Sequence, residues 1–416
     1  MTKLFHSVKL IEDKCKGCSK CMNNCPMEAV RIKNSKAFVI EDKCIDCGEC
    51  IKVCPYNAHD IDRDYLEDIQ KYKIKVAVPS TTLYAQFGEY VDPGIIHAAL
   101  LKLGFDEVYE QTYACDIVAE ITKKEIENTK KPAISLVCPS IARLISINYP
   151  SLIENTIKVL TPIEVAASLI REKYEKAGYK YEDVGIFFLT PCAVWLTSLK
   201  QSPTKQNPDI NGIIAIKDIY SKLLKEIKSG EIEKLDVSSM SFTGLSVVVP
   251  GGLCKSINSS NYITVDGVKN VIKVLDEVES GKLQDVELIE PFACSGGCLG
   301  GSFLVENPYN ARRLLDKCIK DTNFTYSFDE LSDYYMQQFV ENVRNIKFSN
   351  QKLAEDFVSA VKKMKYMNEL VNTLPGTDCG QCGSPSCKAF AEDVVRGLAH
   401  IEDCKYINLG GDVNEG

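Results

Sequence analysis

Short runs of apolar, mostly β-branched residues alternate with helical stretches through the middle of the chain. Continuous apolar runs bounded by turn residues predict buried strands at residues 73–78, 133–137, 184–189 and 246–249. Apolar residues at helical spacing predict helices at residues 163–174 and 217–228. Thr161, Pro162 and Glu164 have the pattern of a helix start with proline in the first turn. Strands that alternate with helices in this way favour an α/β fold with parallel sheets.

Cysteines follow three of the four predicted strands. Cys138 comes directly after the second strand, Cys192 follows the third, and Cys254 follows the fourth after a Pro-Gly-Gly turn. Ligands of open parallel sheets gather at the carboxyl ends of the strands, so these thiols are expected to converge on one site. Each of them taken alone also fits a small buried hydrophobic residue.

Eight cysteines near the N-terminus form two runs that share the spacing C-x2-C-x2-C-x3-C-P. This spacing is typical of bacterial ferredoxins with two clusters, in which the fourth cysteine of each run ligates the cluster of the other run. Disulfides and zinc also occur in cysteine-rich sequences, but neither predicts this duplicated pattern. The spacing therefore predicts one 4Fe–4S cluster on Cys15, Cys18, Cys21 and Cys54, and a second on Cys44, Cys47, Cys50 and Cys25.

A further set of cysteines lies near the C-terminus. An amphipathic helix is expected from about residue 353 through Met367, and a second helix at residues 388–398. Between and after them stand Cys379, Cys382, Cys387 and Cys404, with glycines and Pro385 around the first three. Four thiolates with one distant ligand suit another 4Fe–4S cluster, and zinc is the alternative for any such set.

Composition and charge narrow the class of protein. A length of 416 residues corresponds to about three domains, and the net charge of −8 with no long basic run gives little support to nucleic-acid binding. No apolar stretch approaches the ~18 residues of a membrane span, and the first ten residues lack the apolar core of a signal peptide. Nineteen cysteines without an export signal indicate metal ligation in the cytoplasm, and iron–sulfur clusters favour an anaerobic one.

The segment from Glu290 to Gly301, which reads E-P-F-A-C-S-G-G-C-L-G-G, resembles the third active-site motif of the FeFe hydrogenases, E-x-M-A-C-x-x-G-C-x-x-G-G. The family's T-S-C-C-P motif aligns with residues 135–139, and its M-P-C-x-x-K-x-x-E motif aligns with residues 190–198. The C-terminal cysteine motif resembles that of corrinoid iron–sulfur proteins and of sensory hydrogenases. The chain as a whole resembles the sensory branch of the FeFe hydrogenases.

This resemblance implies a two-lobed α/β hydrogenase-like domain at residues 72–345. An α+β bacterial-ferredoxin domain would precede it at residues 1–71, and a linker helix at 346–370 would lead to a small α-helical 4Fe–4S domain at 371–416. The resemblance also implies that a 4Fe–4S cube lies between the lobes and that Cys298 bridges it to a diiron unit with CO, CN⁻ and dithiolate ligands. The cube ligands would be Cys138, Cys192, Cys294 and Cys298.

The catalytic surroundings of the family's diiron unit are altered in this sequence. Val137 stands where the family has its proton-relaying thiol, Trp195 replaces the lysine that binds a cyanide, and Ser198 replaces the partner acid. Thr190 and Phe292 replace two pocket methionines. Cys254 is a candidate for a replacement proton relay, because the resemblance places its loop near the active site. Cys115 and Cys318 have no evident role, and the four histidines, His6, His59, His97 and His400, are expected to be structural or exposed.

Three functions remain open on this sequence. The first is slow reversible H2 activation or H2 sensing, with electrons relayed through four 4Fe–4S clusters to a ferredoxin or a signalling protein. The second is an electron-transfer or reductase protein whose hydrogenase-like domain holds only the cube and lacks the diiron unit. A third and weaker reading is a scaffold that carries clusters for assembly. In the enzymatic reading, Val137 predicts low turnover, because it offers no exchangeable proton.

Overall fold

Two parallel sheets form the centre of one of the chain's two units, which spans residues 62–347. The computed structural model describes residues 5–200, 209–237, 240–322, 339–340, 353–354 and 356–407. The first sheet has the order β6-β5-β8-β9, with strands β5 (Ile74–Pro79), β6 (Glu107–Val108), β8 (Val184–Thr190) and β9 (Gly212–Ala215). The second has the order β10-β11-β7, with strands β7 (Ala133–Ile134), β10 (Tyr262–Asp266) and β11 (Leu288–Phe292). All pairs in both sheets are parallel, so the predicted α/β architecture is confirmed.

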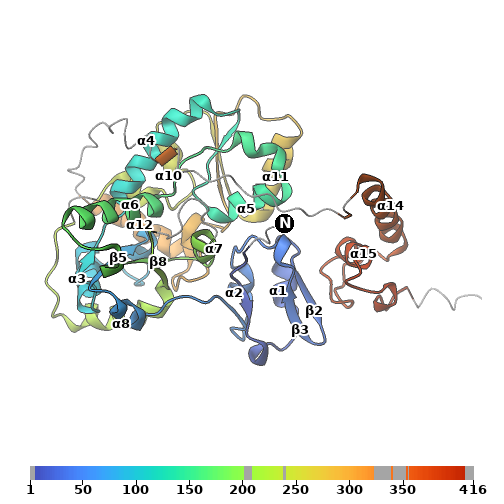
Figure 1. Cartoon of the computed structure of the whole chain (residues 1–416), viewed down its shortest axis with the longest axis horizontal. Helices are drawn as coiled ribbons and strands as arrows, with labels where there is room; N and C mark the ends of the chain where they lie inside the picture. Colours follow the sequence, from blue (N-terminus) through green and yellow to red (C-terminus); the bar gives the residue numbers. More distant parts are fainter. Residues whose placement is uncertain are drawn as a thin grey trace, which may run out of the picture. The chain divides into compact units, whose positions relative to one another are not determined.

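Helices connect the strands of both sheets, and α3 packs against α8 beside β5 and β8 (Figure 1). The helices of this unit are α3 (Pro93–Lys102), α4 (Thr112–Asn128), α5 (Pro139–Asn148), α6 (Pro162–Lys176), α7 (Val194–Lys200), α8 (Ile216–Ser229), α9 (Phe242–Ser246), α10 (Gly252–Ser256), α11 (Val268–Glu279) and α12 (Pro308–Asp321). Short 3-10 helices are η3 (Leu66–Lys71), η4 (Thr81–Ala85), η5 (Pro150–Asn155), η6 (Tyr181–Asp183) and η7 (Gly297–Gly300). Helix α6 starts where the sequence predicted, because the backbone N–H of Thr161 donates to Glu164 Oε2 at 3.0 Å.

Two of the predicted strands differ from the structure. The run at residues 133–137 is a strand only over Ala133–Ile134. The run at 246–249 is not a strand, because Ser246 ends α9 and Val247–Val249 form buried turns. A short apolar run does not distinguish a strand from other buried backbone, and here β10, rather than this run, pairs with β11.

The N-terminal part of the other unit, which comprises residues 1–61 and 348–416, is built from two similar halves. Each cysteine run is preceded by a 3-10 helix of sequence Glu-Asp-Lys, η1 (Glu12–Lys14) or η2 (Glu41–Lys43), and continues into a short helix, α1 (Lys20–Asn24) or α2 (Glu49–Val53). Strand β1 (Lys9–Leu10) pairs with β4 (His59–Asp60), and β2 (Val30–Lys33) forms a hairpin with β3 (Lys36–Val39). Its small core includes two of the cysteines, Cys15 and Cys21, together with Met22, Val30, Ala37 and Ala58.

The C-terminal part of the same unit is helical. Helix α14 (Phe357–Thr373) packs against α15 (Cys387–Val395), and η8 (Ile401–Asp403) precedes Cys404. Both helices were expected, with α14 extending beyond Met367. Leu370, Leu374 and Phe390 form a core with Cys404. The expected boundary between residues 345 and 346 lies outside the described residues.

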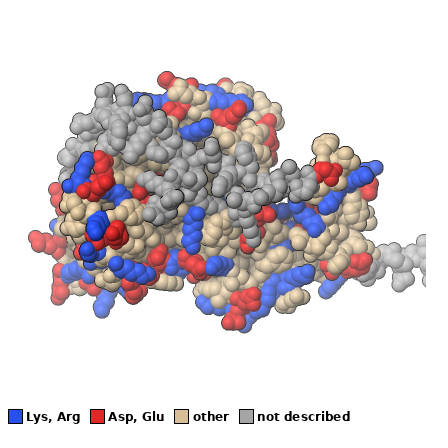
Figure 2. All heavy atoms as spheres, in the orientation of Figure 1, with Lys and Arg blue, Asp and Glu red and all other residues tan. Residues whose placement is uncertain are grey.

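The surface carries both signs of charge. On the face shown in Figure 2, Lys and Arg side chains are interspersed with Asp and Glu. Among the described residues, no helix combines the length and apolar character that crossing a membrane requires.

Candidate functional site

Four cysteines come together at strand ends of the two parallel sheets. Cys138 is the N-cap of α5 and follows β7, Cys192 follows β8, and Cys294 follows β11, with Cys298 in η7. Backbone N–H groups of Ser140, Ile141 and Ala293 hydrogen-bond to the sulfur of Cys138. The site is therefore assembled from both sheets, at the carboxyl ends where parallel α/β folds place their ligands.

The electrostatics of this site disfavour free thiolates. Burial, and then the proximity of Cys294, Cys298 and Cys138, raises the pKa of the Cys192 thiol well above its usual range. Burial, and then Cys138, Cys294 and Glu290, likewise raises the pKa of Cys298. None of these thiols forms a disulfide. Four partly buried cysteines would repel one another as thiolates, and iron ions would offset that repulsion while binding the sulfurs.

Glycines let the third motif approach its neighbours closely. A Cβ at Gly301 would lie 2.4 Å from the carbonyl oxygen of Pro191, and a Cβ at Gly297 would lie 2.5 Å from that of Val248. The N–H of Phe303 donates to Pro191 O at 2.8 Å, and that of Cys298 donates to Val248 O at 2.8 Å. These contacts hold the loop of Cys294 and Cys298 against the loop that carries Cys192.

Glu290 organises the turn that carries Cys254. Its carboxylate accepts the backbone N–H groups of Gly251 at 3.0 Å, Leu253 at 3.1 Å and Cys254 at 3.4 Å. The Cys254 thiol is also hydrogen-bonded to Glu290, and burial followed by this carboxylate raises the thiol's pKa. Cys254 is thus a protonated, fully buried donor to Glu290. The charge of Glu290 also contributes to the raised pKa of Cys298.

The positions that line the family's diiron pocket carry largely apolar side chains. Val137 is half-buried and packs against the main core. Trp195 on α7 is 9% exposed, and its ring meets that of Phe188 edge to face at 5.3 Å. Ser198 is half-buried one turn further along α7. Thr190 Oγ1 accepts the N–H of Cys192 at 3.3 Å and so shapes the loop of that cysteine.

The N-terminal cysteines are brought together in the groups that their spacing predicted. One pocket is lined by Cys15, Cys18, Cys21 and Cys54, together with Ile32 and His59. Burial raises the pKa of Cys21 to about 11, and Cys54, Cys15 and Cys18 contribute to this rise. In the second group, burial and then Cys25 raise the pKa of Cys50. Burial, and then Asp46, Cys50 and Cys47, raise the pKa of Cys44.

Backbone N–H groups point at the sulfurs of both N-terminal groups. Ala29 donates to Cys25 Sγ at 3.3 Å, and Ala58 donates to Cys54 Sγ at 3.2 Å, four residues after the cysteine in each case. Ala37 and Asp46 donate to the sulfurs of Cys15 and Cys44 at 3.4 and 3.3 Å. Such N–H groups stabilise thiolates and tune the potentials of iron–sulfur clusters, so both sites fit this cofactor.

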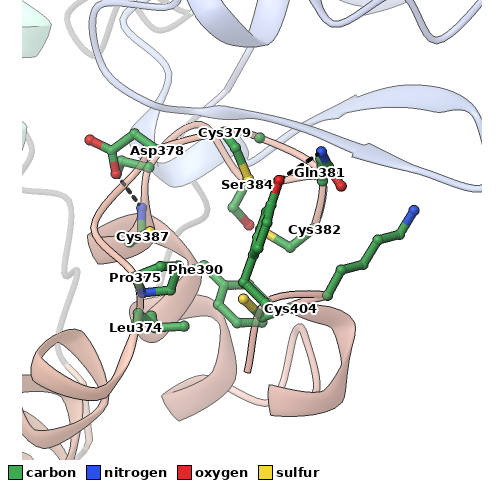
Figure 3. A pocket seen from close by; sticks show the side chains of 14 residues that line it. Leu374, Pro375, Asp378, Cys379, Gln381, Cys382, Ser384, Cys387, Phe390 and Cys404 are labelled. Carbon is green, nitrogen blue, oxygen red and sulfur yellow. Dashed lines mark hydrogen bonds between the residues drawn. The ribbon is translucent and has the colours of Figure 1, made fainter. Parts of the chain in front are cut away.

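The C-terminal cysteines line a second pocket, in the unit that also holds the N-terminal cysteines. Figure 3 shows the side chains of Cys379, Cys382 and Cys404 directed into this pocket, with Phe390 beneath them. Cys387 also lines it, and its N–H donates to Asp378 Oδ1 at 2.7 Å. Burial raises the pKa of Cys382, and Cys404 and Cys379 add to the rise. Four free thiols around one pocket again fit a metal cluster.

His6 is a residue near a cluster site that sequence reasoning did not single out. Its Nδ1 lies 2.7 Å from Asp46 Oδ1, and the two residues lie together with Cys44. The Asp46 carboxylate is fully buried and also accepts the N–H groups of Ser7 and Val8. No spacing rule marks His6, because it precedes the cysteine motif. Cys115 and Cys318 are buried in the core of the sheet-containing unit.

Converging cysteines without disulfides fit a protein that binds metal clusters, and comparison with known families identifies an iron–sulfur redox protein. A family model described as the iron only hydrogenase large subunit, C-terminal domain, matches residues 73–262 and 255–302, more than half of the 416 residues. The chain therefore belongs to this hydrogenase family, and its predicted resemblance to the FeFe hydrogenases is confirmed. A 4Fe-4S dicluster domain matches residues 7–55, and a model for an iron–sulfur cluster segment matches residues 374–406.

Individual relatives agree with this assignment. The chain is 22% identical over 262 residues to the NADP-reducing hydrogenase subunit HndD of Solidesulfovibrio fructosivorans, covering 50% of the chain and 45% of the relative. It is 23% identical over 291 residues to iron hydrogenase 1 of Clostridium pasteurianum, covering 56% of the chain and 50% of the relative. The chain thus spans about half the length of these relatives.

A solved structure shares the hydrogenase fold. A variant of the [FeFe]-hydrogenase HydA1 from Chlamydomonas reinhardtii superimposes with a TM-score of 0.50 at 14% identity. The likeness covers 60% of this chain and 87% of the algal one. At this identity it supports the fold alone.

Proposed function

We propose that the protein is an iron–sulfur redox protein that binds four 4Fe–4S clusters and activates or senses H2 slowly. The single observation that carries this proposal is the convergence of Cys138, Cys192, Cys294 and Cys298 at the ends of two parallel sheets. The other clusters would occupy the two N-terminal groups and the C-terminal pocket. The corresponding segments are residues 1–71, 72–345 and 371–416, with residues 346–370 as a linker.

Cys298 is the proposed bridge to a diiron unit. When bound, such a unit supplies the metal site at which H2 is split or formed. The chain's own residues contribute few mobile protons at this position, since Val137 is a hydrocarbon and Cys254 is held protonated by Glu290. A positioned proton-transfer group typically contributes ~10²–10⁴-fold to a rate, so its loss predicts slow turnover. Slow turnover suits a sensor, whose signal depends on occupancy.

Electrons would pass between this site and a redox partner through the remaining clusters. A ferredoxin or a signalling protein fits this role, because single electrons are what 4Fe–4S clusters exchange. Cysteines that form no disulfide in the described chain favour a reducing cytoplasm, and the proposed iron–sulfur clusters favour an anaerobic one.

A second function is favoured by one observation, the packing of Trp195. Its buried ring lies edge-on against Phe188 at the position where the family has a lysine. Tryptophan offers one neutral N–H donor, whereas a buried anionic ligand such as cyanide is costly without a cationic partner. In this alternative the domain holds only the cube, and the protein transfers electrons or reduces another substrate.

Infrared spectroscopy on anaerobically matured protein separates the two functions. We expect bands from metal-bound CO and CN⁻ in the wild type and their loss in Cys298→Ala. Cys318→Ala is the matched control, because Cys318 is a buried cysteine on α12 outside the four groups. Absence of the bands, beside a hydrogenase matured successfully in the same way, would select the cube-only function.

A further inference from the structure

The two ends of the chain meet through a buried ion pair. The guanidinium of Arg31 on β2 donates to both carboxylate oxygens of Asp393 on α15, with Nη2 3.0 Å from Oδ1. The two residues are 362 positions apart in sequence, and their side chains are only 3% and 4% exposed. Bidentate contacts of this kind are the stronger and more geometrically specific class of ion pair.

Further polar contacts surround this pair. Ser384 Oγ donates to Asp393 Oδ2 at 2.7 Å, which helps to satisfy the carboxylate. Lys43 Nζ lies 2.6 Å from Glu392 Oε2, and these side chains are also largely buried. A transient redox complex is typically held by exposed charges at its rim, whereas these contacts are enclosed like those of a permanent interface.

The loops of two proposed cluster sites touch at the same interface. Gly383 follows Cys382, and its carbonyl oxygen accepts the N–H of Ile32 at 2.9 Å. A Cβ at Gly383 would lie 2.0 Å from Ile32 O, so only glycine permits this approach. The same Ile32 lines the pocket of Cys15, Cys18, Cys21 and Cys54.

A second contact between these loops involves the residue next to a cluster cysteine. A Cβ at Gly380, which follows Cys379, would lie 2.9 Å from the terminal methyl group of Met22. Met22 follows Cys21 and is 1% exposed. The C-terminal cysteine loop is therefore in van der Waals contact with the N-terminal one through two glycines.

We propose that the C-terminal segment is a built-in electron-transfer partner of the N-terminal dicluster segment. The Arg31–Asp393 pair docks it so that the group of Cys379, Cys382, Cys387 and Cys404 adjoins the group of Cys15, Cys18, Cys21 and Cys54. The exchange moves one electron, which oxidises one cluster by one unit and reduces its neighbour by one, and no proton or bond is transferred. This inference rests on the clusters of the proposed function, but not on the diiron unit.

The amide of Ile32 reports the docking directly. Its N–H donates to Gly383 O, so hydrogen exchange there measures separation of the two segments. Asp393→Asn keeps the side chain's shape but leaves Arg31 buried without a counter-charge. We expect Ile32 exchange in the full-length, iron-loaded protein to accelerate by about tenfold or more in this variant.

Two further variants complete the exchange experiment. Lys43→Ala removes only the neighbouring ion pair and should accelerate Ile32 exchange less. Lys52→Ala is the control, since it removes a different ion pair of the same segment, that of Lys52 with Glu49 on the partly exposed face of α2. Rapid Ile32 exchange in the wild type, equal to that of Asp393→Asn, would overturn the docking.

Electron paramagnetic resonance tests the redox part of the proposal. In reduced protein, a neighbouring paramagnetic cluster speeds spin relaxation, so Asp393→Asn should lower the half-saturation power and Lys52→Ala should not. Equal power dependence in the wild type and Asp393→Asn would refute the electron-transfer contact. Iron analysis of the same samples keeps the two proposals apart. Lack of iron on the C-terminal cysteines would contradict the proposed cluster count, whereas full iron with unchanged relaxation contradicts this inference alone.

Discussion

The Glu290 carboxylate is hydrogen-bonded to both the backbone N–H and the thiol of Cys254. Glu290 Oε2 accepts the N–H of Cys254 at 3.4 Å, and the Cys254 thiol is hydrogen-bonded to the same carboxylate. Both side chains are buried, so the carboxylate depends on these donors and on the N–H groups of the α10 turn. The pair joins the turn of α10 to β11, the strand that leads to Cys294.

Replacement of the Cys254 thiol should therefore destabilise the sheet-containing unit. Cys254→Ala leaves a buried carboxylate short of one donor, and we expect it to lower the free energy of unfolding by about 1–3 kcal/mol. Cys254→Ser keeps a donor of similar size and should lose less. Denaturant unfolding followed by the fluorescence of Trp195, the single tryptophan, reports on this unit. Equal loss in both variants would show that volume, and not the hydrogen bond, matters.

Gly301→Ala should disturb one iron–sulfur site selectively. The new Cβ would lie 2.4 Å from Pro191 O and push the loop of Cys298 away from that of Cys192. Iron analysis should show a loss of about four irons, one 4Fe–4S cube, per chain. Gly230→Ala is the control: Gly230 ends α8 at a φ of +71° with no atom within 4 Å of its Cβ position, so this variant adds backbone strain without a clash at a cysteine loop. Full iron content in Gly301→Ala would contradict the proposed role of this contact.

The contribution of Asp116 to the stability of the sheet-containing unit should fall as pH rises from about 4 to 6. Burial raises the pKa of Asp116 from 3.8 to about 6, although Ser241 Oγ donates to it. A raised acid pKa means that the folded state binds the proton more tightly. The resulting stability is complete below pH 3.8 and is lost as pH passes 6.

Asp116→Asn removes this dependence, so it should be more stable than the wild type at pH 7 by about 1–3 kcal/mol and equal to it near pH 4. Denaturant unfolding at the two pH values measures the effect. The exposed residue Asp285, changed to Asn, serves as the control. A variant less stable than the wild type at pH 7 would mean that the ionised carboxylate is favourable in the fold.

Val137→Cys should raise H2 turnover if the diiron unit is present. It restores a thiol at the family's relay position in a similar volume, and we expect an increase of about tenfold or more. Hydrogen–deuterium exchange of the gas measures the change, with Val137→Ala as the control for altered packing. Wild-type protein that already matches the cysteine variant would show that protons take another route, and Cys254→Ala then tests that route.

Removal of iron should unfold the unit formed by the two ends of the chain before the other unit. Its N-terminal core consists largely of cysteines and small side chains, so the clusters supply much of its folding energy. After chelation, the amides of Ala29 and Ala58, which donate to cysteine sulfurs, should lose protection. Amides of β5 and β8 should keep it, because an apolar core encloses them. Retained protection at Ala29 and Ala58 without iron would refute this dependence.

The sequence alone determined the iron–sulfur class of the protein and many of its local elements. Ligand spacing reflects chain geometry over a few residues, so the N-terminal cysteine groups could be predicted from C-x2-C-x2-C-x3-C-P and are found together. Helix α6 and strands β5 and β8 could be predicted for the same reason, because capping residues and long apolar runs act locally.

The tertiary structure decided what depends on distant partners. The run at residues 246–249 satisfies the strand pattern, yet it begins at the end of α9 and contacts the Cys298 loop, and no strand pairs with it in the described chain. Neither the Arg31–Asp393 pair nor the position of His6 beside Asp46 follows from any local motif. A contact across 362 residues depends on how two distant segments pack against each other. Hydrophobic periodicity reports only local structure, so it does not predict such packing.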